Sequence, residues 1–215
     1  MGFASCKYSR LCNKQKLMLL PFFKENCIEA GCDEAGRGCL AGPVFAAAVI
    51  FDKNYTHPVL TDSKKLNDTQ RRALRPQIEK DAVAWAVGIV HNKEIDLINI
   101  LQASFLAMHK ALDELQTPPQ HIIVDGNKFR QYKAIPHTCV VKGDSKYISI
   151  AAASILAKTY RDDFMLQLHN EYPMYNWDSN KGYPTLIHRK AVLKHGKSPY
   201  HRKTFKVSNQ LSFNF

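Results

Sequence analysis

The chain has 215 residues, of which 45% are hydrophobic, a length and composition that favour one globular domain and exclude wholesale disorder and collagen-like repeats. Its 30 basic and 19 acidic residues give a net charge of +11, which is typical of a protein with a polyanionic partner, either a nucleic acid or an anionic membrane surface. The longest near-apolar run, residues 41–51, contains Gly42 and Pro43 and is too short to cross a bilayer.

Residues 1–26 are expected to form an N-terminal extension that only faintly resembles a secretory signal. Its apolar segment is short, contains Pro21, and is followed by Lys24 and Glu25 without a small-residue cleavage site. The six cysteines include no C-x-x-C pair, so the usual zinc spacings are absent. We therefore expect a cytoplasmic protein with reduced cysteines.

The first half of the chain predicts three strands and two helices. A polar loop over residues 52–66 is followed by Asn67 or Asp68, either of which can cap a helix. Pro76 predicts that this helix is kinked or short. Residues 93–115 have apolar side chains at helix spacing over about six turns. The strands are predicted at residues 27–32, 44–51 and 82–90.

The second half of the chain alternates strands with helices. Residues 121–126 form an apolar run ended by glycine, which predicts a buried strand, and residues 138–141 predict another. Helices are predicted at residues 148–169 and 185–195, with Gly196 as the C-terminal cap of the second. The order of elements predicts an α/β protein with a mixed sheet flanked by helices and a C-terminal helical segment.

Acidic residues follow three of the predicted strands. Asp33 and Glu34 follow the first, Asp125 closes the buried strand, and Asp144 follows the next one. Sites in open α/β sheets form beyond the carboxyl ends of strands, so these acids are expected to converge. Converging carboxylates repel one another, and a hard divalent cation such as Mg²⁺ or Mn²⁺ resolves that repulsion. In a basic chain, such a cluster indicates metal-dependent chemistry on a phosphodiester.

Each acid also has a purely structural interpretation. Asp125 begins a common Asp-Gly turn, and Asp144 can cap the following helix. Asp33 and Glu34 are adjacent, so in a strand they point to opposite faces and share a site only if the chain bends just after them.

The glycines at the end of the first strand allow two interpretations. Gly36, Gly38 and Gly42 loosely resemble a dinucleotide-binding loop, but that loop requires a helix directly afterwards. The sequence instead continues with Pro43 and a strand-like segment. We therefore expect a glycine loop whose backbone amides approach a ligand closely, with the charge of Arg37 nearby.

A series of motifs, in sequence order, resembles those of bacterial ribonuclease HII. Any one of them is weak, and together they cover the chain from about residue 28 to 205. The motifs are Asp-Glu-Ala-Gly-Arg-Gly at 33–38 with Leu-Ala-Gly-Pro-Val at 40–44, Asp-Ser-Lys-Lys-Leu at 62–66, Ile-Ile-Val-Asp-Gly-Asn at 122–127, Val-Lys-Gly-Asp-Ser at 141–145, Ala-Ala-Ala-Ser-Ile-Leu-Ala-Lys at 151–158, Arg-Asp at 161–162, Lys-Gly-Tyr-Pro-Thr at 181–185 and His-Arg-Lys-Thr-Phe at 201–205.

The resemblance implies a ribonuclease H-like fold, with residues 27–205 as the catalytic domain and 206–215 as a tail. It implies an endonuclease that cuts the RNA strand of RNA–DNA hybrids and uses two divalent ions, Mn²⁺ or Mg²⁺. Such enzymes also incise 5′ to a single ribonucleotide in duplex DNA, leaving 3′-hydroxyl and 5′-phosphate ends. A monomer without a membrane partner is expected.

The motifs also imply roles for individual residues. By position, Asp33, Glu34, Asp125 and Asp144 match the catalytic, metal-binding acids of the family. The positions that match substrate-binding residues are Gly36, Arg37 and Gly38, in the loop that reads the 2′-hydroxyl, Ser63 and Lys64, near backbone phosphates, and Tyr183, which packs on the ribonucleotide sugar beside the next deoxyribose.

The chain departs from the family pattern at Cys39, where many members have proline. Residues 210–215 loosely resemble a motif that binds the replication sliding clamp; we favour a tail without a partner and keep a weak clamp contact as the alternative. Three other functions are alternatives. The first is an oxidoreductase, which needs a helix after Gly42, and the second is a catalytically silent nucleic-acid-binding module. The third is a ribonuclease HIII, which needs a larger N-terminal domain than 26 residues supply.

Overall fold

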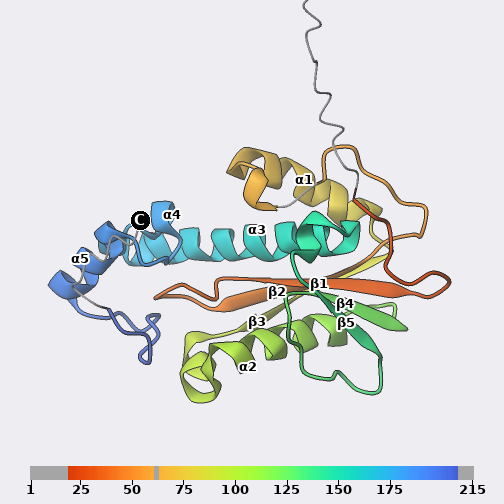
Figure 1. The fold of residues 1–215 in the computed structure, drawn as a ribbon. Coiled ribbons are helices and arrows are strands. Elements are labelled where there is room, and N and C mark those ends of the chain that lie inside the picture. Colours follow the sequence, from red (N-terminus) through yellow and green to blue (C-terminus); the bar gives the residue numbers. More distant parts are fainter. Residues whose placement is uncertain (1–18, 61–62, 208–215) are drawn as a thin grey trace, which may run out of the picture.

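The computed structural model describes residues 19–60 and 63–207, which fold around one five-stranded sheet (Figure 1). Helix α3, with α1 beside it, covers one face of the sheet, and α2 covers the other. The strands are β1 Glu29–Ala35, β2 Val44–Ile50, β3 Ala84–Val90, β4 His121–Asp125 and β5 His137–Val140; the helices are α1 Asp68–Asp81, α2 Asn92–Asp113, α3 Ile148–Glu171, α4 Trp177–Asn180 and α5 Leu186–His195, with short 3₁₀ turns η1 Ser63–Lys65, η2 Gly143–Ser145 and η3 Pro173–Tyr175.

The sheet is mixed, as the sequence predicts. Its strand order is β3-β2-β1-β4-β5, in which β1 pairs antiparallel with β2 and parallel with β4. Strand β2 is buried along its whole length because helices cover both of its faces. Its alternate residues divide between two cores: Ala46 and Ala48 pack toward α2, whereas Ala47 and Val49 pack toward α1 and α3. The α/β fold class is therefore confirmed.

Helix α3 lies close against β1 because Gly31 has no side chain. A Cβ atom there would lie 2.5 Å from backbone atoms of Ser149 and Ile150. The first half of α3 is buried on all sides because the sheet lies below it and α1 above it. This burial explains why the 151–157 segment is apolar except for Ser154.

Helices α1 and α2 agree only in part with the sequence-based prediction. Asn67 caps α1 with a capping box: its side chain accepts from the Gln70 amide at 2.8 Å, and the Gln70 side chain accepts from the Asn67 amide at 2.9 Å. Of the two outcomes predicted from Pro76, a kinked or a short helix, the short helix is wrong, because α1 continues to Asp81. Burial of Ile78 against the core outweighs the one lost backbone hydrogen bond. Helix α2 contains a kink at Asn99 (φ 66°, ψ 163°), which the helix spacing of the apolar residues does not predict.

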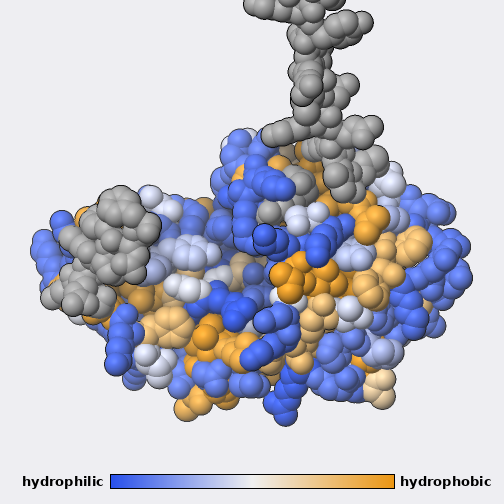
Figure 2. All heavy atoms as spheres, viewed as in Figure 1, coloured by the Kyte–Doolittle hydropathy of each residue, from blue (hydrophilic) through white to orange (hydrophobic). Residues whose placement is uncertain are grey.

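The C-terminal segment packs at one end of α3 (Figure 1). Thr185 caps the N-terminus of α5, and Gly196 ends the helix, as predicted, with φ +79°. The loop expected before α5 contains η3 and α4, which surround the fully buried Trp177. Hydrophilic side chains cover much of the face seen in Figure 2, and hydrophobic ones gather near its middle.

Residues 1–18, 61–62 and 208–215 lie outside the described part of the chain. Most of the expected N-terminal extension and the whole 210–215 motif fall there. No described helix combines the length and the apolar character needed to traverse a lipid bilayer.

Candidate active site

Three of the predicted acids converge where β1 and β4 end. The parallel pairing of these strands stops at Cys32 and Val124. The next residues, Asp33 and Asp125, therefore lie at the same edge of the sheet, and Glu34 follows one position later. All three acids line one cavity of about 310 Å³.

The fourth acid lies beside this cavity but does not line it. Asp144 is buried in η2, and its Oδ2 accepts a hydrogen bond from Lys64 Nζ at 3.1 Å. Lys64 itself lines the cavity. Asp125 is tied to the same turn, since its Oδ1 accepts from the Gly143 amide at 2.7 Å. The 3₁₀ turn therefore joins Asp144 to the acids on the two strands.

Asp33 and Glu34 share the cavity although they point to opposite faces of β1. Asp33 bonds Ser154 of α3, whereas Glu34 also lines a hollow on the α2 side of the sheet. The strand continues through Ala35, and the turn begins only at Gly36, where φ is +97°. No bend between the acids is needed because the cavity wraps around the open edge of the sheet.

Burial sets the electrostatics of the acids. It raises the pKa of Asp33 well above its usual value, and the charges of Glu34 and Asp125 raise it further. Burial also raises the pKa of Glu34, although Arg37, whose Nη1 lies 2.9 Å from Glu34 Oε1, acts in the opposite direction. Of the three carboxylates that share this poorly solvated space, Glu34 alone forms an ion pair within the described residues, with Arg37.

The donors present fit a hard divalent cation. They are all carboxylate oxygens, which Mg²⁺ and Mn²⁺ prefer, and added positive charge would relieve the repulsion that raises the pKa of Asp33. Within the described residues, no three His, Cys, Asp or Glu side chains enclose an ion as they stand. Glu34 and Asp144 are instead held by Arg37 and Lys64, so ion binding requires those two acids to leave their cationic partners.

A buried arginine holds the glycine loop, residues 36–38, by its carbonyl oxygens. Arg202 donates to Gly36 O at 2.7 Å, to Arg37 O at 2.8 Å and to Gly42 O at 3.1 Å. It is fully buried, and burial lowers its pKa to about 10, so it stays charged at neutral pH. With the carbonyls turned inward, the Arg37 and Gly38 amides donate no hydrogen bond to another described residue.

A second buried arginine completes this support. Arg161 is also fully buried and donates to Ala41 O at 3.1 Å, Pro43 O at 3.1 Å and Lys181 O at 2.8 Å. A Cβ on Gly36 would lie 2.1 Å from Arg161 Nε, so this position requires glycine for space as well as for its positive φ. Arg161 thus joins the segment just after the glycine loop to the segment that carries Tyr183.

Tyr183 lines the same cavity, and a histidine network fixes its backbone. Trp177 Nε1 donates to His188 Nε2 at 3.0 Å, so His188 is protonated on Nδ1, which donates to Tyr183 O at 2.9 Å. His201 Nδ1 accepts from the Ser198 amide at 3.0 Å, so its Nε2 donates to His188 Nε2 at 3.1 Å. Burial lowers the pKa of both histidines, that of His201 to about 3.

Nine of the ten residues predicted for the site line this cavity, and Asp144 reaches it through Lys64. The prediction missed four further lining residues, Ala35 and the polar Arg71, Ser154 and Lys158. Ser154 Oγ lies 2.8 Å from Ser63 Oγ, and Lys158 pairs with Asp162. The four-residue spacing of Ser154 and Lys158 places both on one face of α3 and was the available signal.

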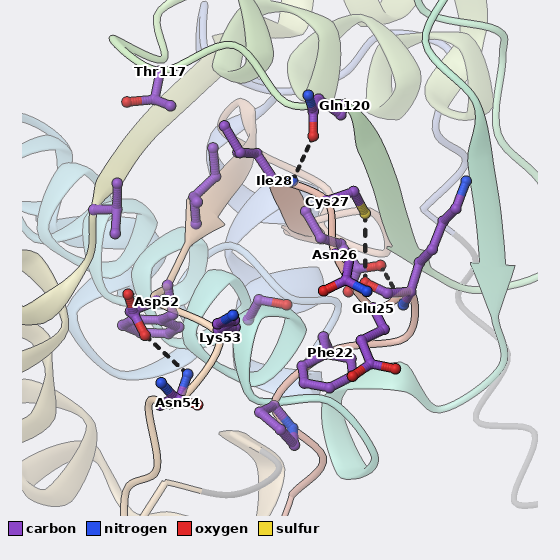
Figure 3. Close-up of a pocket in the computed structure, with 17 residues that line it drawn as sticks. Phe22, Glu25, Asn26, Cys27, Ile28, Asp52, Lys53, Asn54, Thr117 and Gln120 are labelled. Atoms are coloured by element: carbon purple, nitrogen blue, oxygen red, sulfur yellow. Dashed lines mark hydrogen bonds between the residues drawn. The ribbon is translucent and has the colours of Figure 1, made fainter.

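A larger cavity, of about 650 Å³, lies at the other end of β1 (Figure 3). The chain before β1 and the segment after β2 form its walls, and Gln120 Oε1 accepts from the Ile28 amide there at 3.0 Å. None of the predicted site residues lines it. The site chemistry is thus confined to the carboxyl ends of β1 and β4.

Comparison with known proteins identifies the family. A model of the family described as Ribonuclease HII matches residues 30–208. A ribonuclease HII from Bacteroides thetaiotaomicron is 62% identical over 92% of this chain and all of its own length. One from Bacteroides fragilis is 65% identical over 88% of this chain and 94% of its own.

Solved structures agree with these sequence matches. Ribonuclease H2 from Pyrococcus horikoshii superposes with a TM-score of 0.69 at 29% identity, over 83% of this chain and 94% of that one. An RNase HII from Archaeoglobus fulgidus, solved in a PCNA:RNase HII complex, gives a TM-score of 0.70 at 25% identity over 87% of this chain and all of its own.

Strand β2 follows Gly42 and Pro43, which excludes the dinucleotide-binding alternative. The chain therefore belongs to the ribonuclease HII family, whose members are ribonuclease H-type endonucleases that act on RNA–DNA hybrids.

Proposed function

We propose that this enzyme also incises 5′ to single ribonucleotides in duplex DNA, leaving 3′-hydroxyl and 5′-phosphate ends, by two-metal-ion catalysis. Asp33, Glu34, Asp125 and Asp144 are the proposed ligands of Mg²⁺ or Mn²⁺. One observation supports this most strongly. A buried acid cluster, in which Asp33 and Asp125 have no ion-pair partner among the described residues, shares its cavity with a glycine loop and a tyrosine.

The bound ions would supply Lewis acidity and lower the pKa of a water molecule. The protein's own residues do the positioning. Asp33 and Asp125 sit on paired strands, so their separation is fixed by the sheet. Lys64 and Lys158 lie on the cavity wall, where the phosphates flanking the cut would pass. Movement of Glu34 and Asp144 toward the ions would release Arg37 and Lys64 to contact those phosphates.

Recognition of the ribonucleotide is assigned to the glycine loop and Tyr183. The 2′-hydroxyl alone distinguishes RNA from DNA at one nucleotide, and it is both donor and acceptor. The Arg37 and Gly38 amides are available to donate to it because Arg161 and Arg202 hold the carbonyls of the surrounding segment. The Tyr183 ring, 38% exposed on the same cavity, would pack on the sugar beside the next deoxyribose.

Residues 27–205 are the proposed catalytic domain, which the family match over residues 30–208 supports. The archaeal complex with PCNA supports a weak sliding-clamp contact through the tail as a second candidate partner. A monomeric, cytoplasmic enzyme is proposed.

The test is cleavage of a labelled DNA duplex that carries one ribonucleotide, with Mg²⁺, with Mn²⁺ and with EDTA. We expect a metal-dependent cut on the 5′ side of the ribonucleotide and no cut in the matched all-DNA duplex. Cleavage of a continuous RNA–DNA hybrid without any cut at the single ribonucleotide would reject the junction activity. Tight binding with no cut of either substrate would reject the proposed metal site.

A further inference from the structure

The catalytic cavity continues beyond the acids toward α2. Glu34, Arg37 and Asp125 belong both to its wall and to a small hollow on the α2 side of the sheet. That hollow shares Asn127 and Lys128 with an open groove of about 730 Å³. We call it the α2 groove, and its lining includes Gln102, Phe105, Asn127, Lys128, Phe129 and Arg130. A continuous depression therefore leads from the acids, away from Tyr183, to the segment between β4 and β5.

The segment between β4 and β5 is strongly basic. Residues 126–136 contain Lys128, Arg130 and Lys133 and no acidic residue. Lys133 pairs with Asp113 at 2.8 Å. The side chains of Lys128 and Arg130 are exposed and form no ion pair with any described residue. Two uncompensated cations thus line the groove.

The backbone beneath these cations is fixed. Phe129 packs edge-on against Phe105 of α2, with ring centroids 6.1 Å apart, and against His109 at 5.3 Å. His109 Nε2 also lies 3.0 Å from Arg130 O. The buried Nδ1 of His137, also on the groove wall, has no hydrogen-bond partner among the described residues. The groove is therefore a supported surface that presents positive charge.

We propose that the α2 groove binds the backbone of the cleaved strand on the 5′ side of the scissile phosphate, with Lys128 and Arg130 contacting its phosphates. The orientation rests on the proposed function, in which the ribonucleotide and the next deoxyribose lie at the glycine loop and Tyr183. The strand upstream of the cut then leaves the acids on the opposite side, where the groove begins. Positive charge and continuity with the catalytic cavity favour a nucleic-acid backbone over a protein segment.

The test compares substrates whose arms differ in length. Duplexes carrying one ribonucleotide would have an upstream arm of about twelve or about two base pairs, with the downstream arm unchanged. Binding is measured by fluorescence anisotropy in EDTA, and cleavage with Mg²⁺ at saturating substrate. For Lys128→Gln/Arg130→Gln we expect about tenfold weaker binding of the long-arm duplex, a salt slope smaller by about 1.8, and unchanged kcat. On the short-arm duplex the variant should bind like wild type.

A matched control removes the same charge elsewhere. Lys53 and Lys80 are exposed and lie outside the catalytic cavity and the groove. Lys53→Gln/Lys80→Gln should bind both duplexes within about twofold of wild type. Equal losses in the two double variants, or a groove loss that persists on the short arm, would show only a general charge effect and overturn the proposal. If shortening the downstream arm instead removes the difference, the strand direction is wrong. Absence of incision by wild type would reject the proposed function, whereas incision with normal long-arm binding by the groove variant would reject only this inference.

Discussion

The two halves of the site contain buried charges of opposite sign, and the positive charges have the more complete set of hydrogen-bond partners within the protein. On the acid side, Asp33, Glu34 and Asp125 repel one another, and burial raises the pKa of Asp33 and Glu34. On the loop side, Arg161 and Arg202 are fully buried, yet carbonyl oxygens accept hydrogen bonds from Nε, Nη1 and Nη2 of each guanidinium.

This difference separates a part of the site that must change on binding from a part that must not. Repulsion among the acids favours the binding of cations. When cations bind, Glu34 and Asp144 must leave their present ion pairs with Arg37 and Lys64. The guanidinium groups of Arg161 and Arg202 need no new partner when a ligand binds, since they already donate hydrogen bonds to carbonyl oxygens. The loop that meets the sugar is therefore preorganised, whereas the acids are completed only with metal and substrate.

The largest expected effect comes from the acid side. Asp125→Asn should reduce kcat by at least about 1,000-fold, equivalent to about 4 kcal/mol, because it removes a proposed metal ligand. Substrate binding should persist, and the unfolding temperature should stay level or rise because one repelling charge is lost. Kinetics with Mg²⁺ and thermal unfolding test both effects.

A buried acid outside the site provides the contrast for Asp125. Glu29 accepts hydrogen bonds from the Phe23 and Lys24 amides and lies 2.9 Å from His121 Nδ1. Glu29→Gln should lower stability and leave kcat near that of wild type. Activity close to wild type in the Asp125 variant would show that the metal site is misassigned.

The loop side should respond in stability. Arg202→Lys leaves at least one or two buried carbonyls unpaired and should lower the free energy of unfolding by about 3 kcal/mol. For a chain of this size, that is a fall in Tm of about 6–12 °C. Arg189 makes one hydrogen bond to a carbonyl, that of Pro184, so Arg189→Lys should change Tm much less. Equal shifts in Tm for the two variants would contradict the special role of Arg202.

The histidine network predicts a pH dependence of stability. Because burial lowers the pKa of His188 and His201 in the folded protein, the unfolded chain takes up protons first as the pH falls. Stability is therefore retained above the unfolded pKa of about 6.5 and lost progressively toward the folded value, about 3 for His201. Each histidine should cost at most about 1.4 kcal/mol per pH unit in this window. Denaturant unfolding from pH 7 to 5 should show a shallower dependence in His201→Asn, and an identical slope would reject the network as its source.

The smallest expected effect separates two substrates. Tyr183→Ala should reduce cleavage at a single ribonucleotide by about tenfold more than cleavage of a continuous hybrid, since one ring–sugar contact is lost. Tyr183→Phe keeps the ring and should stay near wild type. Equal losses on both substrates would leave Tyr183 with a purely structural role, like the buried groups behind it.

The acids and the glycine loop could be read from the sequence because their signals are local. Asp33 and Asp125 each follow an apolar run of residues in the sequence, and parallel pairing of β1 with β4 brings these positions together. Arg161 and Arg202 were present in the motifs, but no local pattern revealed that both hold carbonyls of the 36–43 segment. Arg202 Nη2 bonds a carbonyl 166 positions away, a contact that only the packing of the C-terminal segment creates.

The sequence by itself determined the α/β class, the order of the elements and the acids at the strand ends, because hydrophobic periodicity and strand-end chemistry are local properties. The tertiary structure decided how Asp33 and Glu34 share a cavity, since the sheet edge opens where β1 and β4 stop pairing. It also decided between the alternatives that Pro76 leaves open for α1, which continues to Asp81 because burial of Ile78 outweighs one lost hydrogen bond. Finally, it set the path of the α2 groove, which depends on how α2 and the segment after β4 pack together.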